Sequence, residues 1–298
     1  MEKLLQLLFS GVALGSVYAL LALGFVVVFK ATQVVNFAHP ALLIVGTYCA
    51  ARFRTTEELP FVVAVLAGVA VAVALAVLVE RLLVRPIVQR SVVAVAIMTI
   101  GVDVVAQTEI TRRLGIDIVP VGDPWQSATV DVLGITVPQT RVAALATALV
   151  VLDGFFAWSR FSDWGVAMRA SAEDRGTAEL MGVRPGRVAA LVWILAAVLA
   201  VLAGVFLSAF PAPGVSPTTS TAALRAFPAA ILGGLDSTGG ALVGGLTIGV
   251  AETLTQGYQD NLTFLGEGFS AVMPYVVMVA VLLVRPTGLF GTRAVVRV

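Results

Sequence analysis

Long apolar stretches alternate with short polar connections along almost the whole chain. Stretches such as 61–79 and 189–210 carry no charged residue. About 20 apolar residues in a helix span the roughly 30 Å hydrocarbon core of a bilayer. The apolar segments lie near 7–29, 34–53, 60–80, 92–107, 141–158, 189–210, 222–235, 238–256 and 269–285. The pattern predicts an all-α polytopic membrane protein of about 8–10 transmembrane or re-entrant helices, forming a single transmembrane domain over residues 1–298.

The composition supports this class and excludes several others. Hydrophobic residues make up 59% of the 298 residues and charged residues only 12%, about half the share of a soluble domain. The net charge of +1 gives no support for nucleic-acid binding. The single cysteine, Cys49, excludes an internal disulfide. The first apolar stretch is too long for the core of a signal peptide, so we expect it to remain as a membrane helix.

Charged residues predict the side of the membrane that each connection faces. Basic residues dominate 81–91, 159–188 and the C-terminal tail, whereas 108–140 and 252–268 are acidic. Because Lys and Arg favour the cytoplasmic side, we expect the basic connections inside and the acidic ones outside. The basic group comprises Arg81, Arg85, Arg90, Arg160, Arg169, Arg175, Arg184, Arg187, Arg285, Arg293 and Arg297, and the acidic group Glu109, Asp117, Asp123, Asp131, Glu252, Asp260 and Glu267.

A glycine-rich break interrupts the apolar segment 222–254. One continuous span there would place the basic tail outside, so the chain must turn near 235–240. The two halves are then either two short spans or a re-entrant pair of half-helices. Non-helical backbone at membrane depth needs protein or a wet cavity around it, so we expect this region to line a pathway. The candidate residues are Gly233, Gly234, Asp236, Gly239 and Gly240.

A second interrupted segment, VVNFAHP, lies at 34–40. Pro40 lacks a backbone N–H and disfavours helical geometry in the residue before it, so a helix should begin near Pro40 after an extended entry. Interrupted segments in both halves of a chain indicate a translocation pathway, although two unrelated kinked helices give the same pattern. His39 either contacts the solute or hydrogen-bonds at the helix entry. The candidate pathway residues here are Asn36, Phe37, His39 and Pro40.

A compact charged segment, RASAEDRGTAELMGVRPGR, lies between two spans at 169–187. Ser171 and Asp174 fit a capping box, and Gly182 fits a left-handed C-terminal cap. The pattern predicts a short helix over 172–181 that either docks on a soluble partner or lies solvated on the membrane surface. The residues that would carry docking are Arg169, Ser171, Glu173, Asp174, Arg175, Glu179, Met181 and Gly182.

The sequence offers no catalytic set and no metal site. There is no phosphate-binding loop and no lysine after Lys30, so ATP would have to be hydrolysed by another chain. Asp103 and Asp153 lie in apolar runs, where ionised groups are costly. They either serve transport or reach water near helix ends. With Asp236 they are the acids that an ion-driven carrier, the second functional class, would need. The four tryptophans, Trp125, Trp158, Trp164 and Trp193, are expected mostly as interfacial anchors.

Several stretches together resemble the permeases of branched-chain amino-acid ABC transporters. They are GVALGSVYALLALGFVVVF with VVNFAHP, ERLLVRPI at 80–87, RASAEDRGTAELMGV, RAFPAAILGGLDSTGGALVGGLTIGVAE at 225–252, and RPTGLFG at 285–291. They occur in the family's order over nearly the whole chain, whose length is similar to the shorter of the two permease types. The chain departs from the family pattern at Pro40, where Gly is usual, and at Asp236, where a small or apolar residue is usual.

The resemblance implies a non-enzymatic permease domain in a prokaryotic plasma (inner) membrane. It would pair with a second permease, homologous or identical, and with two cytoplasmic ATPase subunits that bind ATP and Mg, while this chain binds no cofactor. An extracytoplasmic solute-binding protein would deliver the solute, and an ATPase would grip the connection at about 159–188. The solute would be a branched-chain amino acid or, as in other members of the wider group, urea, an amide or an organic acid.

Overall fold

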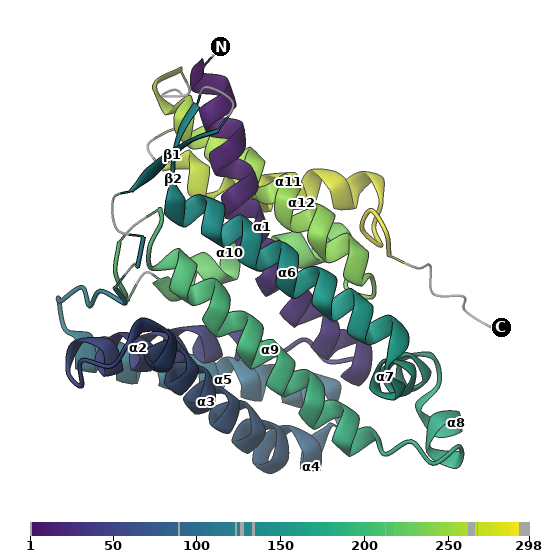
Figure 1. The fold of residues 1–298 in the computed structure, drawn as a ribbon. Coiled ribbons are helices and arrows are strands. Elements are labelled where there is room, and N and C mark those ends of the chain that lie inside the picture. Colours follow the sequence, from purple (N-terminus) through teal and green to yellow (C-terminus); the bar gives the residue numbers. More distant parts are fainter. Residues whose placement is uncertain are drawn as a thin grey trace.

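The computed structural model describes residues 2–88, 90–122, 124–125, 128–132, 135–211, 213–217, 219–261, 266 and 268–291. Long helices form one bundle, coloured from purple at the N-terminus to yellow at the C-terminus in Figure 1. The strands of the described part are β1 (Thr129–Val132) and β2 (Ile135–Pro138), paired antiparallel with Thr129 opposite Pro138. The predicted all-α class is confirmed.

Long and short helices build the bundle in the described residues. The long ones are α1 (Glu2–Thr32), α2 (His39–Thr55), α3 (Phe61–Val79), α5 (Val92–Leu114), α6 (Gln139–Phe161), α9 (Pro185–Leu207), α10 (Thr219–Gly233), α11 (Thr238–Gly257) and α12 (Met273–Val284). The short ones are the π-helix η1 (Glu80–Val84), α4 (Arg85–Ile87), α7 (Asp163–Glu173), α8 (Arg175–Leu180) and the 3-10 helix η3 (Phe269–Ala271). Five are long and apolar enough to cross a membrane: α1, α3 continued through α4, α5, α6 and α9.

Helices α1 and α11 pack antiparallel through small residues. A Cβ added at Gly11 would lie 2.8 Å from the Cα of Val250, and one at Gly15 would lie 2.8 Å from the Cα of Leu246. Gly249 lies against the backbone of α1 from the other side. Lipid tails are as apolar as the side chains, so close backbone approach at small residues is a main source of helix association in membranes. This interface holds α11 against α1, which is buried along most of its length.

The basic connections meet at one end of the bundle, here called the basic end. The guanidinium of Arg85 lies against Gly186, in the first turn of α9. Arg169 shares a cleft with Asp236 and with Pro286 near the end of the described chain. Helices α7 and α8 project beyond the ends of α6 and α9 (Figure 1). The grouping of basic connections therefore agrees with the prediction from charge, while Arg293 and Arg297 of the tail lie outside the described residues.

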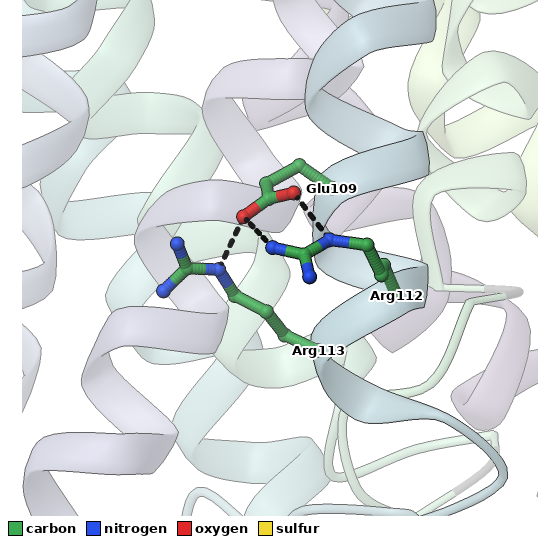
Figure 2. Close-up of polar contacts among 3 residues, drawn as sticks. All are labelled: Glu109, Arg112 and Arg113. Carbon is green, nitrogen blue, oxygen red and sulfur yellow. Dashed lines mark hydrogen bonds and ion pairs between the residues drawn. The ribbon is translucent and has the colours of Figure 1, made fainter.

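The acidic connections lie at the opposite end, here called the acidic end, near the N-terminus. Lys3 lies over the ring of Tyr258, 5.1 Å from its centroid. Helix α5 runs further than its apolar segment, to Leu114, so the predicted start of the connection at 108 is wrong. Figure 2 shows Glu109 bonded to both Arg112 and Arg113 on the last turns of α5. Asp123 and Glu267, also assigned to this group, lie outside the described residues.

The predicted break near 235–240 is confirmed, and its backbone turn occupies 234–237. Ser220, at the start of α10, bonds Gln107 toward the acidic end of α5, whereas Asp236 lies in the cleft at the basic end. Helices α10 and α11 thus each run between the two ends. This course matches the alternative of two short spans, but neither helix is among the five that are long and apolar enough to cross a membrane. Helix α10 is only about 22 Å long at 1.5 Å per residue.

The motif RPTGLFG closes the C-terminal end of α10. The amides of Leu289 and Phe290 donate to the carbonyls of Leu232 and Gly233, at 2.8 and 3.1 Å. These carbonyls have no partner within their own helix, because the last turn of any helix leaves its carbonyls unpaired. Gly288 has a φ of +82° and lies against Gly234, so a side chain there would clash. The motif is a structural cap for the α10–α11 turn.

One predicted interfacial anchor is wrong. Trp193 lies within α9 and is only 1% exposed. A single aromatic residue in an apolar run fits a core position as well as an interfacial one, and only the neighbours in space decide between them. Trp125 does lie near the acidic end, where its ring stacks on Phe206 at 6.3 Å between centroids.

Candidate functional site

The charged connection between α6 and α9 forms two short helices rather than one. Asp174 separates α7 from α8 with an extended backbone, at φ −150° and ψ 106°. Its Oδ1 accepts a hydrogen bond from the amide of Thr177 at 3.0 Å, so Asp174 is the N-cap of α8. The predicted start at 172 and the predicted cap at Ser171 are wrong. Ser171 is buried inside α7. The sequence could not distinguish the two, because Ser and Asp are both favoured N-cap residues.

Both ends of α8 are capped. The Thr177 amide holds the pKa of Asp174 below its usual value of 3.8. A lowered carboxyl pKa stabilises the fold at all pH values above the usual pKa, and this stability is lost as the pH falls through the lowered value. Gly182 has a φ of +88°, as predicted for a left-handed C-terminal cap. The amide of Val183 then bonds the carbonyl of Ala178 at 3.0 Å.

The C-terminal end of α8 and its C-cap, Met181, present two large apolar side chains away from the bundle. Leu180 is 89% exposed and Met181 is 81% exposed, next to the exposed carboxylate of Glu179. Ala178 is buried. The sequence analysis named Met181 as a docking residue but missed Leu180. Its position beside Met181 at the end of the helix could have indicated that it shares the same surface. Exposed apolar groups rimmed by charge mark a surface that another molecule covers. The side chain of Arg175 lies outside what the structure describes.

A cleft of about 650 Å³ joins this segment to the α10–α11 turn. It brings Arg169 and Glu173 of α7 into one space with Asp236 of the turn. The rest of the lining is Phe29, Lys30, Gln33, Ala172, Ile231, Leu235, Leu282, Pro286 and Thr287. Arg169 also donates a hydrogen bond to the carbonyl of Ser159, which ties α7 to the end of α6. Two residue sets that were predicted separately therefore share a cavity.

The entry to α2 is a turn and not the predicted extended segment. Asn36 accepts a hydrogen bond from the amide of Ala38 at 3.0 Å, through its side-chain Oδ1. The helix begins at His39, with Pro40 in its first turn, as predicted. The ring of His39 is fully buried, 4.5 Å from that of Phe25 between centroids. Neither ring nitrogen has a hydrogen bond of standard geometry within the described residues, so the side-chain bond at the helix entry belongs to Asn36.

A polar stripe on α5 faces the α2 entry. The hydroxyl of Thr99 accepts a hydrogen bond from the amide of Phe37 at 3.2 Å. Asp103 accepts one from Gln107 at 2.5 Å, and Gln107 accepts one from the hydroxyl of Ser220 at 3.1 Å. Sequence reasoning considered Asp103 alone and missed the others. The spacing of Thr99, Asp103 and Gln107, four residues apart on a helix, was the signal, because such residues share a face.

The glycines of the α10–α11 break are packing positions for the most part. A Cβ at either Gly233 or Gly240 would overlap the backbone of the other. Gly234 has a φ of +103° and lies against Gly291. Gly239 has open space around it. Of the five candidate residues at this break, Asp236 is the one that lines the cleft. The role of the glycines in a pathway stays a prediction.

Glu252 was placed in an acidic connection by sequence, and that prediction is wrong. It lies inside α11 and is 4% exposed. Its carboxylate accepts a hydrogen bond from the hydroxyl of Tyr18 at 2.8 Å and forms an ion pair with Arg225 at 2.6 Å. These three residues come from α11, α1 and α10. Nothing in the local sequence indicates that these three residues meet. Tyr18 lies more than 200 residues away from both Arg225 and Glu252 along the chain.

Comparisons with known proteins extend this picture. A family model described as "Branched-chain amino acid transport system / permease component" matches residues 7–284. The high-affinity branched-chain amino acid transport system permease protein LivH of Salmonella typhimurium is 30% identical, over 99% of this chain and 97% of the relative. LivH of Escherichia coli K12 gives the same identity and coverage. The corresponding permease protein BraD of Pseudomonas aeruginosa is 28% identical over 99% and 98% of the two chains. No solved structure matches significantly.

Proposed function

The chain belongs to the family of branched-chain amino acid transport permeases, and from this membership we propose that it is the membrane-spanning subunit of an ATP-driven importer. It is a multi-pass transport subunit. ATP and Mg are bound by two separate cytoplasmic ATPase chains, and a second permease, homologous or identical, completes the membrane part. The transport names of the relatives support a branched-chain amino acid as the solute.

The observation that carries this proposal is the cleft shared by Arg169, Glu173 and Asp236. Helix α8 presents Leu180 and Met181 to an ATPase groove, in the mode of an amphipathic helix on a soluble partner. Movement of α8 is passed to α7 through their junction at Asp174. Helix α7 then displaces the α10–α11 turn across the cleft. Coupling of this kind needs elements whose arrangement responds to both the motor and the pathway. Helices α8 and α7 are in contact, and α7 faces the turn across the cleft.

The orientation of the bundle in the membrane follows from its charge. Basic connections favour the cytoplasmic side, so the basic end faces the ATPase subunits in a prokaryotic plasma membrane. The acidic end, with the β1–β2 hairpin, faces the solute-binding protein. This assignment places α8 and the cleft on the side where ATP is available.

Solute would pass along the α2 entry and the polar stripe of α5. Asn36 Nδ2 and Asp103 Oδ1 are buried and have no hydrogen bond of standard geometry within the described residues, although the backbone amide of Ala41 lies near the Asp103 carboxylate. Unpaired buried polar atoms are rare in folded proteins, and a bound ion or a functional role is one explanation for their presence. An amino acid carries both a carboxylate, which accepts hydrogen bonds, and an ammonium group, which donates them. A buried donor and a buried acceptor near the α2 entry suit such a solute.

Reconstitution of the complete transporter in liposomes tests this function. We expect leucine uptake to require both ATP and the solute-binding protein, and to survive collapse of the proton gradient. Valine and isoleucine should compete with leucine, whereas urea should not. Uptake that follows the proton gradient without ATP would instead support an ion-driven carrier. Competition by urea but not by valine would replace the proposed solute while keeping the ATP-driven mechanism.

A further inference from the structure

A second cleft at the basic end is lined by arginines that the coupling mechanism does not use. It measures about 590 Å³ and receives Arg81 from η1, Arg85 from α4, and Arg184 and Arg187 from the start of α9. The remaining lining is Glu179, Val183, Pro185, Gly186 and Ala190. Four cations against one carboxylate leave the lining with a formal charge of +3, from 4 − 1.

The local backbone adds to this positive field. Helix α9 begins at the cleft with Pro185 and Gly186, and the N-terminus of a helix carries a partial positive charge. Arg184, the N-cap of α9, makes no side-chain capping bond. Its carbonyl instead accepts hydrogen bonds from the amides of Arg187 and Val188, at 2.9 and 3.2 Å. A Cβ at position 186 would overlap the guanidinium of Arg85 in its present position, so a larger residue there would require this flexible side chain to move.

The arginines are adjacent to an exposed apolar surface on a helix of membrane-spanning length. Leu78 and Leu82 lie on the same continuous helix as Arg81 and are 52% and 65% exposed. These leucines belong to a segment that is long and apolar enough to cross the membrane. Arg85 forms an ion pair with the buried Glu80 at 3.5 Å, yet its side chain remains 47% exposed. The cleft therefore offers cations for an anionic group next to apolar surface for hydrocarbon chains.

We propose that this cleft is a binding site for the phosphate headgroup of an anionic phospholipid of the inner leaflet. Guanidinium groups match the geometry of phosphate oxygens and can bind them in pairs. Basic pockets between membrane helices on the cytoplasmic side suit such headgroups. Free phosphate shares the headgroup chemistry, but Leu78 and Leu82 favour a ligand that also carries acyl chains. The site goes beyond the proposed transport function and does not depend on ATP.

Native mass spectrometry of the purified full chain, with added phosphatidylglycerol or phosphatidylcholine, tests the site. The double variant Arg81→Gln with Arg187→Gln should bind phosphatidylglycerol on the order of tenfold more weakly, because each interfacial arginine contributes to the attraction. Arg81→Lys with Arg187→Lys keeps both charges and should retain most of the binding. Arg112→Gln with Arg113→Gln removes the same charge at the acidic end and should leave binding unchanged.

Three outcomes would overturn the proposal. Phosphatidylcholine could bind as tightly as phosphatidylglycerol, or the acidic-end variant could lose as much affinity as the cleft variant. Inorganic phosphate could also displace the lipid at concentrations near the dissociation constant of phosphate itself. That result would assign the site to free phosphate. Circular dichroism of each variant shows whether it is folded. If the glutamine variant is not folded, the comparison of phosphatidylglycerol with phosphatidylcholine on the unchanged chain still tests the proposal.

Discussion

Replacing both Leu180 and Met181 with aspartate is expected to lower solute uptake on the order of tenfold or more, because buried apolar anchors carry most of the energy of an interface. Both side chains are more than four-fifths exposed in the isolated chain, so their loss should not disturb the bundle. The chain should still insert in the membrane in normal amounts. Uptake by the reconstituted transporter and the amount of ATPase that co-purifies are the two measurements.

The matched control exchanges the two side chains, Leu180→Met with Met181→Leu. This exchange conserves volume and apolar character, so it is expected to retain uptake. If the aspartate variant transports as well as the unchanged chain, α8 does not dock on a motor subunit. Loss of uptake without loss of the co-purifying ATPase would place the defect in signal transfer through α7 rather than in docking.

Arg225→Met is expected to cause the largest loss of stability. It would leave the carboxylate of Glu252 buried without its cation, and breaking a buried ion pair in this way costs about 3–5 kcal/mol. The pair is close, at 2.6 Å, and its side chains are only 28% and 6% exposed. Thermal unfolding of the purified chain in detergent measures the effect. Because the pair joins α10 to α11, uptake should fall in parallel.

The double variant Arg225→Met with Glu252→Gln separates charge burial from shape. Removal of both charges avoids the stranded carboxylate, so the double variant should recover most of the lost stability. Tyr18→Phe, which removes one hydrogen bond to Glu252, should cost only about 1–2 kcal/mol. A single Arg225→Met variant as stable as the unchanged chain, or a double variant less stable than the single one, would contradict this account of the triad.

The features that could be predicted from the sequence are those with a local physical cause. Apolar runs of membrane length determine the helices, and Pro40 and Gly182 determine local boundaries through their backbone preferences. Basic connections meet at one end because Lys and Arg favour the same side of the membrane. The wrong boundary at Ser171 has a local cause too. Two capping residues three positions apart compete, and the one whose oxygen reaches a free amide becomes the cap.

Features that depend on distant segments could not be predicted in the same way. The sequence around Glu252 predicts an acidic residue in a connection. Only the folded structure shows that Tyr18 and Arg225 bind its carboxylate. The coupling cleft combines the end of α1 with α7 and the α10–α11 turn, and no periodicity within one segment links them. The break glycines were predicted as important, but their packing against Gly291 and against each other appears only when the helices are assembled.

Cysteine cross-linking tests the central claim, that α8 is gripped by a separate ATPase subunit at the cytoplasmic side. In a Cys49→Ser background, Leu180→Cys should cross-link to the ATPase in the assembled transporter and should resist labelling by an impermeant thiol reagent added outside intact cells. Ile116→Cys at the acidic end, where Ile116 is fully exposed, should show the reverse pattern. Labelling of Leu180→Cys from outside, or no cross-link from it to any other chain, would contradict the account.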